Sequence, residues 1–163
     1  MRRCCNSISL AAAGVPFRIV PGITAGIGGL AYAGIPLTHR DTNSAVTLLT
    51  GHGSDGGVPD GLDWPAIARG APVLVLYMAS RHLPSIAKRL MAAGRSRAEP
   101  VAIISKATTA EQRVVVSSLG EIVTAAIAVE APSIVVIGEV VRFRETLDWV
   151  GARGPRGEDP ASS

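Results

Sequence analysis

A threonine at the start of a glycine-rich segment is the first place where residue types and spacing favour ligand binding. Residues 17–20 (FRIV) predict a short strand, which Pro21 and Gly22 end. From Thr24 onward, small and apolar residues alternate as in a tightly packed helix, and Thr24 is placed to cap it. The unpaired N–H groups of the first helical turn would then face a ligand over the carboxyl end of the strand.

The glycines of this predicted helix match a dinucleotide-binding fingerprint only weakly. Residues 26–31 (GIGGLA) have the G-x-G-x-x-A form. In that fingerprint the first glycine lies in the turn directly after the strand, and a later strand ends in an acidic residue. Here Gly26 follows a Pro-Gly break and a capping threonine, and Asp41 follows a loop. We interpret Gly26, Gly28 and Gly29 as sites of close packing.

Three polar side chains after the helix have suitable chemistry for binding or proton transfer. Arg40 carries the planar guanidinium that grips carboxylates in a fork, and His39 and His52 carry imidazole groups that could relay protons. Two lone histidines without a cysteine partner do not form a typical metal site, so we expect no metal. The only cysteines, Cys4 and Cys5, are adjacent, which disfavours a disulfide between them and fits a reducing cytoplasm.

The composition predicts a soluble α/β domain rather than a nucleic-acid-binding or membrane protein. The chain has 163 residues, 47% of them apolar, which is enough for one core. Its net charge of +3 is small and its aromatic content only 4%, so we expect no nucleic-acid partner. No run of about 18 apolar residues lacks charges or Pro/Gly, so we expect no membrane span. Residues 2–13 are too short and polar for a signal peptide, and we expect a disordered tail there.

Strands and helices are predicted to alternate along the rest of the chain. Asp63 is placed to cap a short helix, and Ser80 a longer amphipathic helix that Gly94 ends. This alternation predicts an α/β fold with a mixed or parallel sheet, followed by a disordered tail over residues 151–163. The predicted strands are 44–50, 72–78, 101–104, 113–118 and 133–138, the other helices are 64–68 and 119–129, and the apolar face of the long helix carries Leu83, Ile86, Ala87, Leu90 and Met91.

A series of motifs appears in an order typical of one enzyme family. Residues 21–25 (PGITA) precede the small-residue helix, and residues 33–41 (AGIPLTHRD) follow it. Further motifs lie at 49–52 (LTGH), 76–78 (LYM), 107–109 (ATT), 131–132 (AP), 138–142 (GEVVR) and 147–149 (LDW). Over residues 11–152 the chain therefore resembles the uroporphyrinogen-III C-methyltransferase family of the tetrapyrrole methylase superfamily. The Gly-rich loop with which members begin and their Gly-Gly-Asp-Pro segment do not occur in it.

The resemblance implies a tetrapyrrole methylase fold, with two α/β domains and S-adenosylmethionine bound in the cleft between them. Residues 1–10 would be an unrelated or displaced start, and residues 11–36 the tail of the N-terminal domain, a strand plus a linker helix. Residues 37–150 would be the complete C-terminal domain, a mixed sheet with flanking helices, followed by the tail at 151–163. Because a small cofactor buries most of its surface in its pocket, we expect donor binding and activity to be impaired with one wall missing.

The resemblance also implies which residues contact the methyl donor. Thr24 and Ala25 lie at the family's threonine–alanine contact, Met78 at its strand-end methionine near the adenine, and Ala107 at a small-residue backbone contact. Backbone groups at strand ends can recognise an adenine edge, and a small side chain lets a ligand approach. Without the resemblance, Thr24 would be interpreted as a helix cap, Met78 as a core residue and Ala107 as a turn residue.

The family's reaction transfers two methyl groups from S-adenosylmethionine to uroporphyrinogen III, giving precorrin-2 for cobalamin and sirohaem. On this basis Arg40 would bind a substrate carboxylate, and His39 and His52 would bind substrate or relay protons. The reaction needs no covalent nucleophile, and we assign no catalytic residue. We expect a cytoplasmic homodimer, as is typical of the family.

Two alternatives are left open by the sequence. In the first alternative, the chain is a non-catalytic dimerisation or binding fragment of such an enzyme. In the second and weaker alternative, it is a nicotinamide dinucleotide-binding domain that uses residues 26–31. The first alternative depends on whether the missing Gly-rich segments are encoded immediately upstream. The second predicts binding of a nicotinamide dinucleotide and none of S-adenosylhomocysteine.

Overall fold

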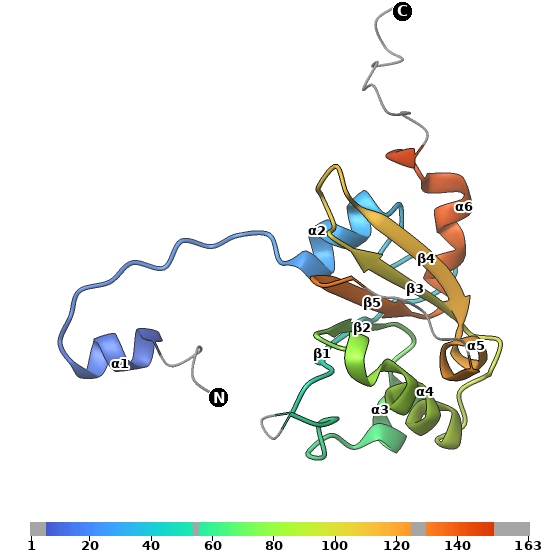
Figure 1. The fold of residues 1–163 in the computed structure, drawn as a ribbon, viewed down its shortest axis with the longest axis horizontal. Coiled ribbons are helices and arrows are strands. Elements are labelled where there is room, and N and C mark those ends of the chain that lie inside the picture. The colour runs from blue at the N-terminus through green and yellow to red at the C-terminus, as the bar shows by residue number, and fades with distance from the viewer. Residues whose placement is uncertain (1–5, 54–55, 125–129, 152–163) are drawn as a thin grey trace, which may run out of the picture.

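A five-stranded mixed sheet is the centre of the computed structural model, which describes residues 6–53, 56–124 and 130–151 (Figure 1). The strand order is β1-β2-β5-β3-β4. Strands β1 and β2 are parallel, β5 is antiparallel to both β2 and β3, and β4 is antiparallel to β3. The predicted mixed sheet is confirmed. Its strands are β1 (Thr47–Thr50), β2 (Leu74–Tyr77), β3 (Pro100–Ser105), β4 (Arg113–Ser118) and β5 (Ser133–Ile137).

The strand directions bring several turns to one edge of the sheet. Because β5 is antiparallel to β2 and to β3, those two strands point the same way, as does β1. The carboxyl ends of β1, β2 and β3 and the start of β5 therefore share one edge, here called the carboxyl edge. It carries Gly51 and His52 after β1, Met78 after β2, residues 106–108 after β3 and residues 131–132 before β5.

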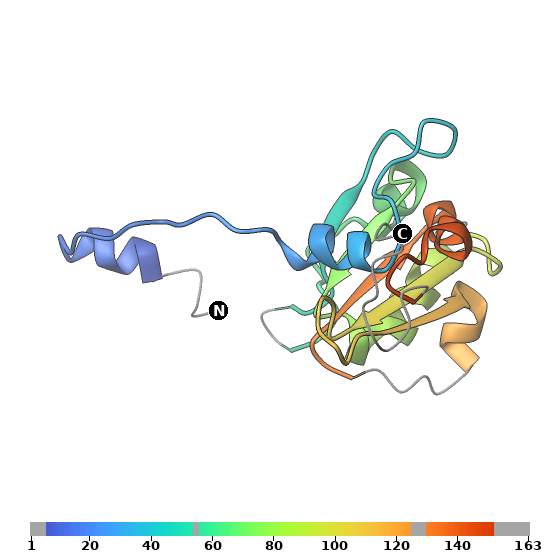
Figure 2. The same ribbon diagram turned by 90° about the horizontal axis from the view of Figure 1, so that it is seen from above.

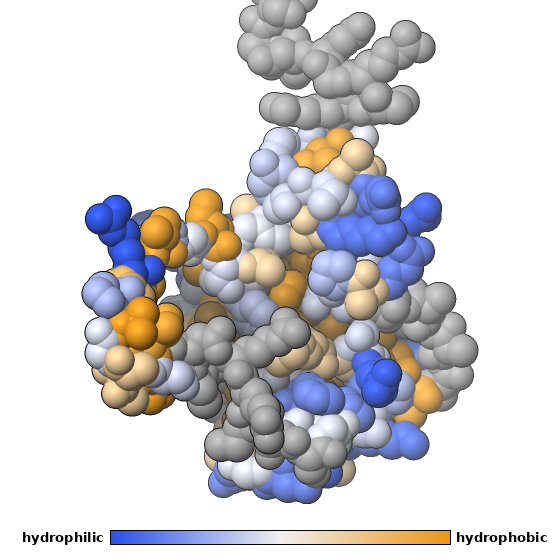
Figure 3. All heavy atoms as spheres, turned by 60° about the vertical axis from the view of Figure 1, so that its left-hand side comes forward, coloured by the Kyte–Doolittle hydropathy of each residue, from blue (hydrophilic) through white to orange (hydrophobic). Residues whose placement is uncertain are grey.

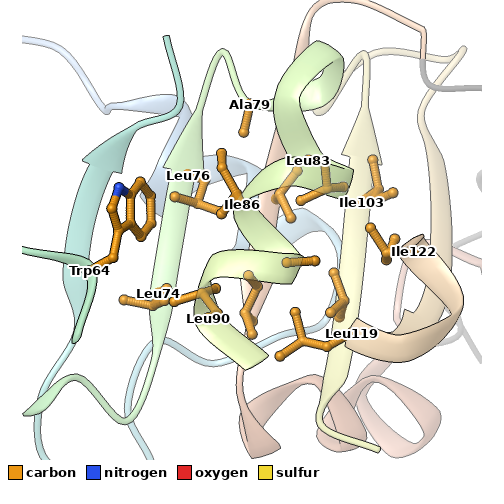
Figure 4. Packing of buried hydrophobic residues seen from close by; sticks show 14 of the residues in the cluster. Trp64, Leu74, Leu76, Ala79, Leu83, Ile86, Leu90, Ile103, Leu119 and Ile122 are labelled. Atoms are coloured by element: carbon orange, nitrogen blue, oxygen red, sulfur yellow. The ribbon is translucent and has the colours of Figure 1, made fainter. Parts of the chain in front are cut away.

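Helices cover both faces of the sheet. Helices α3 (Trp64–Gly70), α4 (Leu83–Ala92) and α5 (Leu119–Thr124) lie on one face, where their side chains pack with Leu74 and Leu76 (Figure 4). On the other face, α2 (Ala25–Tyr32) and the 3-10 helix η2 (Glu139–Phe143) pack in the layer that contains Val73 and Val75, and α6 (Arg144–Leu147) follows η2. Alternate residues of β2 thus contact opposite layers, and both faces of this strand are buried.

The amphipathic helix is confirmed, with a different start. Leu83, Ile86, Ala87 and Leu90 of α4 are buried as predicted, and Met91 is half-buried. Ser80 does not cap α4, because the short 3-10 helix η1 (Ser80–His82) comes first and His82 takes the cap position. After α4, Gly94 has φ +101°, which suits a helix C-terminus.

The predicted cap of α3 is confirmed. The Asp63 side chain accepts a hydrogen bond from the Ala66 N–H at 2.9 Å. We expect Asp63→Ala to lower the free energy of unfolding by about 1 kcal/mol, because an unpaired N–H is left at the helix start. Urea unfolding measures this loss. Asp60→Ala, which removes only the exposed ion pair with Arg89, is the matched control, and a loss no larger than in that control would contradict the cap.

The N-terminal segment differs from its prediction in two ways. Residues 6–12 form helix α1 (Asn6–Ala12) where we expected a disordered tail, since the alanine-rich run favours a helix. The strand predicted at residues 17–20 is wrong. This segment is extended, but no described strand pairs with it, and Phe17, Ile19 and Val20 are 45%, 73% and 80% exposed. β-Forming residues make a strand only beside a partner that takes up their backbone hydrogen bonds.

An exposed arm therefore leads into the sheet-containing body. Residues 15–24 form this arm, and α1 stands away from the body at its far end (Figures 1 and 2). Apolar side chains lie along it, as Figure 3 shows. The rest of the helix predicted at 119–129, the predicted tail after Gly151 and the first five residues lie outside the described residues. No described helix has the length and hydropathy needed to cross a membrane.

Candidate functional site

Backbone strain is concentrated at the carboxyl edge. In the described part of the chain, the residues other than glycine with positive φ are Met78 (54°), Lys106 (46°) and Thr108 (69°). Met78 follows β2, and the other two flank Ala107 after β3. Strained residues of this kind cluster at ligand sites, where the surrounding structure holds them. This edge is therefore the best candidate for a binding site.

The largest pocket at this edge, here called the edge pocket, has a volume of about 590 Å³. It brings together three residues predicted from the sequence, Ala25, Met78 and His52. Tyr77 and Arg81 also line it and were not predicted as site residues, although Tyr77 lies within the motif at residues 76–78. Its remaining lining residues are Ser80, Ala131, Pro132, Ser133 and Ile134.

A second pocket, here called the glycine pocket, adjoins the first and has a volume of about 320 Å³. Thr24, Ala25 and Ala107 line it, together with Gly28 and Gly29. Ala25 lines both pockets. The four residues predicted to contact a methyl donor thus lie around two adjoining pockets, where small side chains leave room for a ligand.

The hydroxyl of Tyr77 joins the start of α2 to the sheet. It lies 2.6 Å from the Thr24 hydroxyl and accepts a hydrogen bond from the Gly26 N–H at 3.0 Å. Thr24 holds the cap position of α2, but its side chain bonds to Tyr77 and makes no cap hydrogen bond, so the predicted side-chain cap is wrong. A Cβ at Gly26 would lie 2.1 Å from the Tyr77 oxygen, and one at Gly29 would lie 3.1 Å from the Ala107 Cβ. Both glycines are sites of close packing, as predicted.

His39 and Arg40 lie on another part of the molecule and line neither pocket. The His39 ring contacts that of Phe143, with centroids 4.2 Å apart, and its Nδ1 accepts from the Asp41 N–H. The buried Asn43 fixes the turn by accepting from the His39 N–H and donating to two carbonyls. Arg40 is exposed on this turn.

His52 stands at the rim of the edge pocket, where its ring stacks on His82 with centroids 5.9 Å apart. Across the described ranges, no group of three or more His, Cys, Asp or Glu residues could hold a metal ion.

A third pocket, the α6 groove, lies beside the C-terminal end of α2 and has a volume of about 510 Å³. Ile27, Ile35, Leu147 and Trp149 are among its lining residues, and none of the predicted site residues is.

An ion-pair clamp holds the strained turn after β3. The Lys106 ammonium lies 2.5 Å from Glu111 and 2.9 Å from Glu130, which precedes β5. Hydrogen bonds to Glu111 and Glu130 raise the pKa of Lys106 above its ordinary value of 10.5. The hydrogen bond and the charge of Lys106 lower the pKa of Glu130 below its ordinary value of 4.5.

These shifts predict the pH range over which the clamp holds. The Glu130 contribution is complete above 4.5 and is lost as the pH falls through its lowered pKa. The Lys106 contribution is complete below 10.5 and is lost as the pH rises through its raised pKa. We expect the amide NMR signals of residues 107–109 to stay constant between about pH 5 and 9. Glu130→Gln should shift them at pH 7, and wild-type signals that titrate within this range would contradict the clamp.

The architecture and the edge pockets define an α/β protein with a candidate ligand site at the carboxyl edge of a mixed sheet. The family model for tetrapyrrole (corrin/porphyrin) methylases matches residues 2–123. The chain belongs to this family, which confirms the resemblance found in its motifs.

Relatives of this chain include enzymes of tetrapyrrole metabolism. It is 59% identical to a uroporphyrinogen-III C-methyltransferase of Sinorhizobium sp over 140 residues, which cover 85% of this chain and 50% of the relative. It is 48% identical to a siroheme synthase of Azotobacter vinelandii over 146 residues, which cover 88% of this chain and 31% of the relative. The chain thus spans half or less of the length of these relatives.

Solved structures agree with the fold. The uroporphyrin-III C-methyltransferase of Thermus thermophilus in complex with S-adenosylhomocysteine matches with a TM-score of 0.73 and 34% identity, over 83% of this chain and 58% of that chain. A cobalt precorrin-4 methyltransferase matches with a TM-score of 0.72 at 24% identity over 83% of this chain and 57% of that chain, which supports the fold alone. The predicted tetrapyrrole methylase fold is confirmed.

Proposed function

We propose that this chain supplies one wall of the methyl-donor site of an S-adenosylmethionine-dependent uroporphyrinogen-III C-methyltransferase. The observation that carries the proposal is the convergence of Thr24, Ala25, Met78 and Ala107 on two pockets that share Ala25. Three of these residues are far apart in the sequence, and only the strand order brings them to one edge. The relative from Sinorhizobium and the donor-product complex from Thermus support this assignment.

The residues present fit a nucleoside-bearing cofactor. Ala25, Ala107 and the glycines of α2 leave open space, while the strained backbone at Met78 presents peptide groups at the rim. Bound S-adenosylmethionine would supply an electrophilic methyl group. The part of these residues is to hold the donor in a fixed orientation and to exclude water from it. Together with a second wall, they would bury most of a ligand of this size.

We assign substrate binding to the exposed polar residues. Arg40, on the turn fixed by Asn43, would pair with a carboxylate of uroporphyrinogen III, which carries acetate and propionate groups. His52, at the rim of the edge pocket, would contact the substrate or relay a proton. His39 packs on Phe143, and we assign it to the same substrate surface. The product precorrin-2 would serve both sirohaem and cobalamin synthesis.

We also propose the domain boundaries and the assembly. Residues 11–36 would belong to the N-terminal methylase domain and residues 37–150 to the C-terminal one, although α2 packs on the sheet through Leu30. The working form would be a cytoplasmic homodimer. Exposed apolar residues on edge strand β4, Val115 and Val116, support association with another surface. Sedimentation of the purified chain tests this proposal, and a monomer at all concentrations would contradict it.

Titration calorimetry with S-adenosylhomocysteine tests donor binding. We expect saturable binding by the chain and at least about tenfold weaker binding by Ala25→Trp, whose side chain would take up space where the two pockets meet. Ala66→Trp, in the exposed first turn of α3, is the matched control and should bind as the wild type does. No binding by a folded chain would contradict the proposal and favour a non-catalytic fragment. Binding of a nicotinamide dinucleotide instead would favour the dinucleotide-binding alternative.

A further inference from the structure

We infer that Tyr77 is a positioning residue whose hydroxyl holds the first turn of α2 against the end of β2 and so fixes two segments of the proposed donor wall relative to each other. This inference rests on the proposed function. The two segments are Thr24–Ala25 at the start of α2 and Met78 directly after β2. Tyr77 is the last residue of β2 and directly precedes Met78.

Tyr77 lies on a strand that is held firmly within the sheet. Strand β2 is paired on both sides, with Tyr77 opposite Thr50 of β1 and Ile134 of β5. The Tyr77 carbonyl also accepts a hydrogen bond from the Gly51 N–H at 2.7 Å. The tyrosine side chain packs against the core layer that contains α2. Its hydroxyl is therefore a fixed point relative to the sheet.

The start of α2 has little else to hold it. The arm before it is exposed, and Thr24 and Ala25 are exposed as well. In the described structure, the hydrogen bonds to the Tyr77 hydroxyl are the only ones between the first turn of α2 and the sheet. The other end of α2 is tied down by the Trp149 indole, which donates to the Ala31 carbonyl, and by Gln112, which donates to the Tyr32 carbonyl. Without Tyr77, α2 would be anchored at one end only.

Gly26 makes the contact possible. A Cβ at this position would lie 2.1 Å from the Tyr77 oxygen and 2.7 Å from the ring carbon that carries it. The hydroxyl can reach the Gly26 N–H only because no side chain stands in its way. Gly26, the first glycine of the apparent dinucleotide fingerprint, is thus explained by the contact between α2 and β2. Gly26 and Tyr77 are 51 positions apart in the sequence.

Ligand affinity depends on the fraction of molecules in which the first turn of α2 is in place. A ligand that contacts both segments binds only when the first turn of α2 is in place, so its apparent affinity is reduced by the fraction of molecules in that state. The hydroxyl raises this fraction before the ligand arrives. Its loss should weaken binding without unfolding the sheet, because the ring and the strand stay where they are.

Three variants test the inference. Tyr77→Phe removes only the hydroxyl, and Gly26→Ala displaces it. Ser96→Ala is the control, since it removes a hydroxyl that accepts a hydrogen bond from the Ala98 N–H and lines neither pocket. We expect the Gly26 amide to exchange with solvent about tenfold faster in Tyr77→Phe. We expect S-adenosylhomocysteine to bind about three- to tenfold more weakly to Tyr77→Phe and to Gly26→Ala, with little change in melting temperature.

The two readouts separate this inference from the proposed function. Equal Gly26 exchange in the wild type and in Tyr77→Phe would overturn the role of the hydroxyl, as would unchanged affinity despite faster exchange. An equal loss of affinity in Ser96→Ala would overturn it too. If the wild-type chain does not bind S-adenosylhomocysteine at all, the proposed donor binding by this chain fails, and the inferred effect on affinity fails with it. Slow wild-type exchange that the Tyr77→Phe variant accelerates would then show that the hydroxyl still anchors α2.

Discussion

Replacing Arg95 by methionine should lower the free energy of unfolding by about 3–5 kcal/mol, because it leaves a largely buried carboxylate without its partner. The side chains of Arg95 and Glu99 are only 7% and 13% exposed and meet through two hydrogen bonds. Arg95 also donates to the carbonyls of Ala71 and Pro72, so it ties the turn after α4 to the segment before β2. Equilibrium unfolding in urea measures the loss.

Two controls make this prediction specific. Arg142→Met removes an exposed pair with Glu139, whose side chains are 62% and 55% exposed, and should cost less than about 1 kcal/mol. The double replacement of Arg95 and Glu99 by methionine should cost less than Arg95→Met alone, since no charge is then stranded. A loss below about 1 kcal/mol for Arg95→Met would contradict the importance of the buried pair.

A second large effect is expected for Gly34→Ala, which should cost about 2–5 kcal/mol. Gly34 has φ +67°, a left-handed conformation that disfavours side chains. A Cβ there would also lie 2.2 Å from the Leu147 carbonyl oxygen, a backbone atom that moves only if α6 moves. Such a shift would break the hydrogen bond from Arg144 to the Ala33 carbonyl at 2.5 Å.

The matched control for this substitution is Gly94→Ala. Gly94 also has positive φ, +101°, but a Cβ there would meet no atom within 4 Å. Its replacement should therefore cost only the conformational strain, about 1 kcal/mol. Thermal unfolding of both variants gives the comparison. Equal losses would show that the contact between Gly34 and α6 is not tight.

Features encoded by neighbouring residues could be predicted from the sequence. The cap at Asp63 needs only the next three residues, and the buried face of α4 follows from its helical period. The apolar runs at residues 72–78, 101–104 and 133–138 predicted strands, and β2, β3 and β5 lie there. These predictions succeed because the interactions that decide them are short in sequence or depend on hydropathy alone.

Features decided by distant residues could not be predicted. Thr24 looks like a cap in isolation, but Tyr77, fifty-three positions away, takes its hydroxyl. Residues 17–20 look like a strand, yet a strand forms only where another strand accepts its hydrogen bonds. The residues next to Thr24 do not reveal its contact with Tyr77, and those next to residues 17–20 do not reveal whether a strand will pair with them.

The candidate site could likewise be predicted only in part from the sequence. The motifs indicated Ala25, Met78 and Ala107, but only the antiparallel β5 between β2 and β3 shows that the turns with Met78 and Ala107 share one edge, and the packing of α2 places Ala25 beside them. Tyr77 lies in the motif at residues 76–78, but its place at the pocket, like that of Arg81, is visible only in the structure. The sequence also placed Arg40 and His52 in one group, whereas the structure puts His52 at the edge pocket and Arg40 on a separate turn.

The most direct measurement is the location of S-adenosylhomocysteine on the isotope-labelled chain by NMR titration. The proposed donor wall predicts that the largest amide shifts occur at Gly26, Gly29, Met78 and Ala107, around the two pockets that share Ala25. Shifts confined to the α6 groove near Leu147, or no shifts in a folded chain, would contradict it.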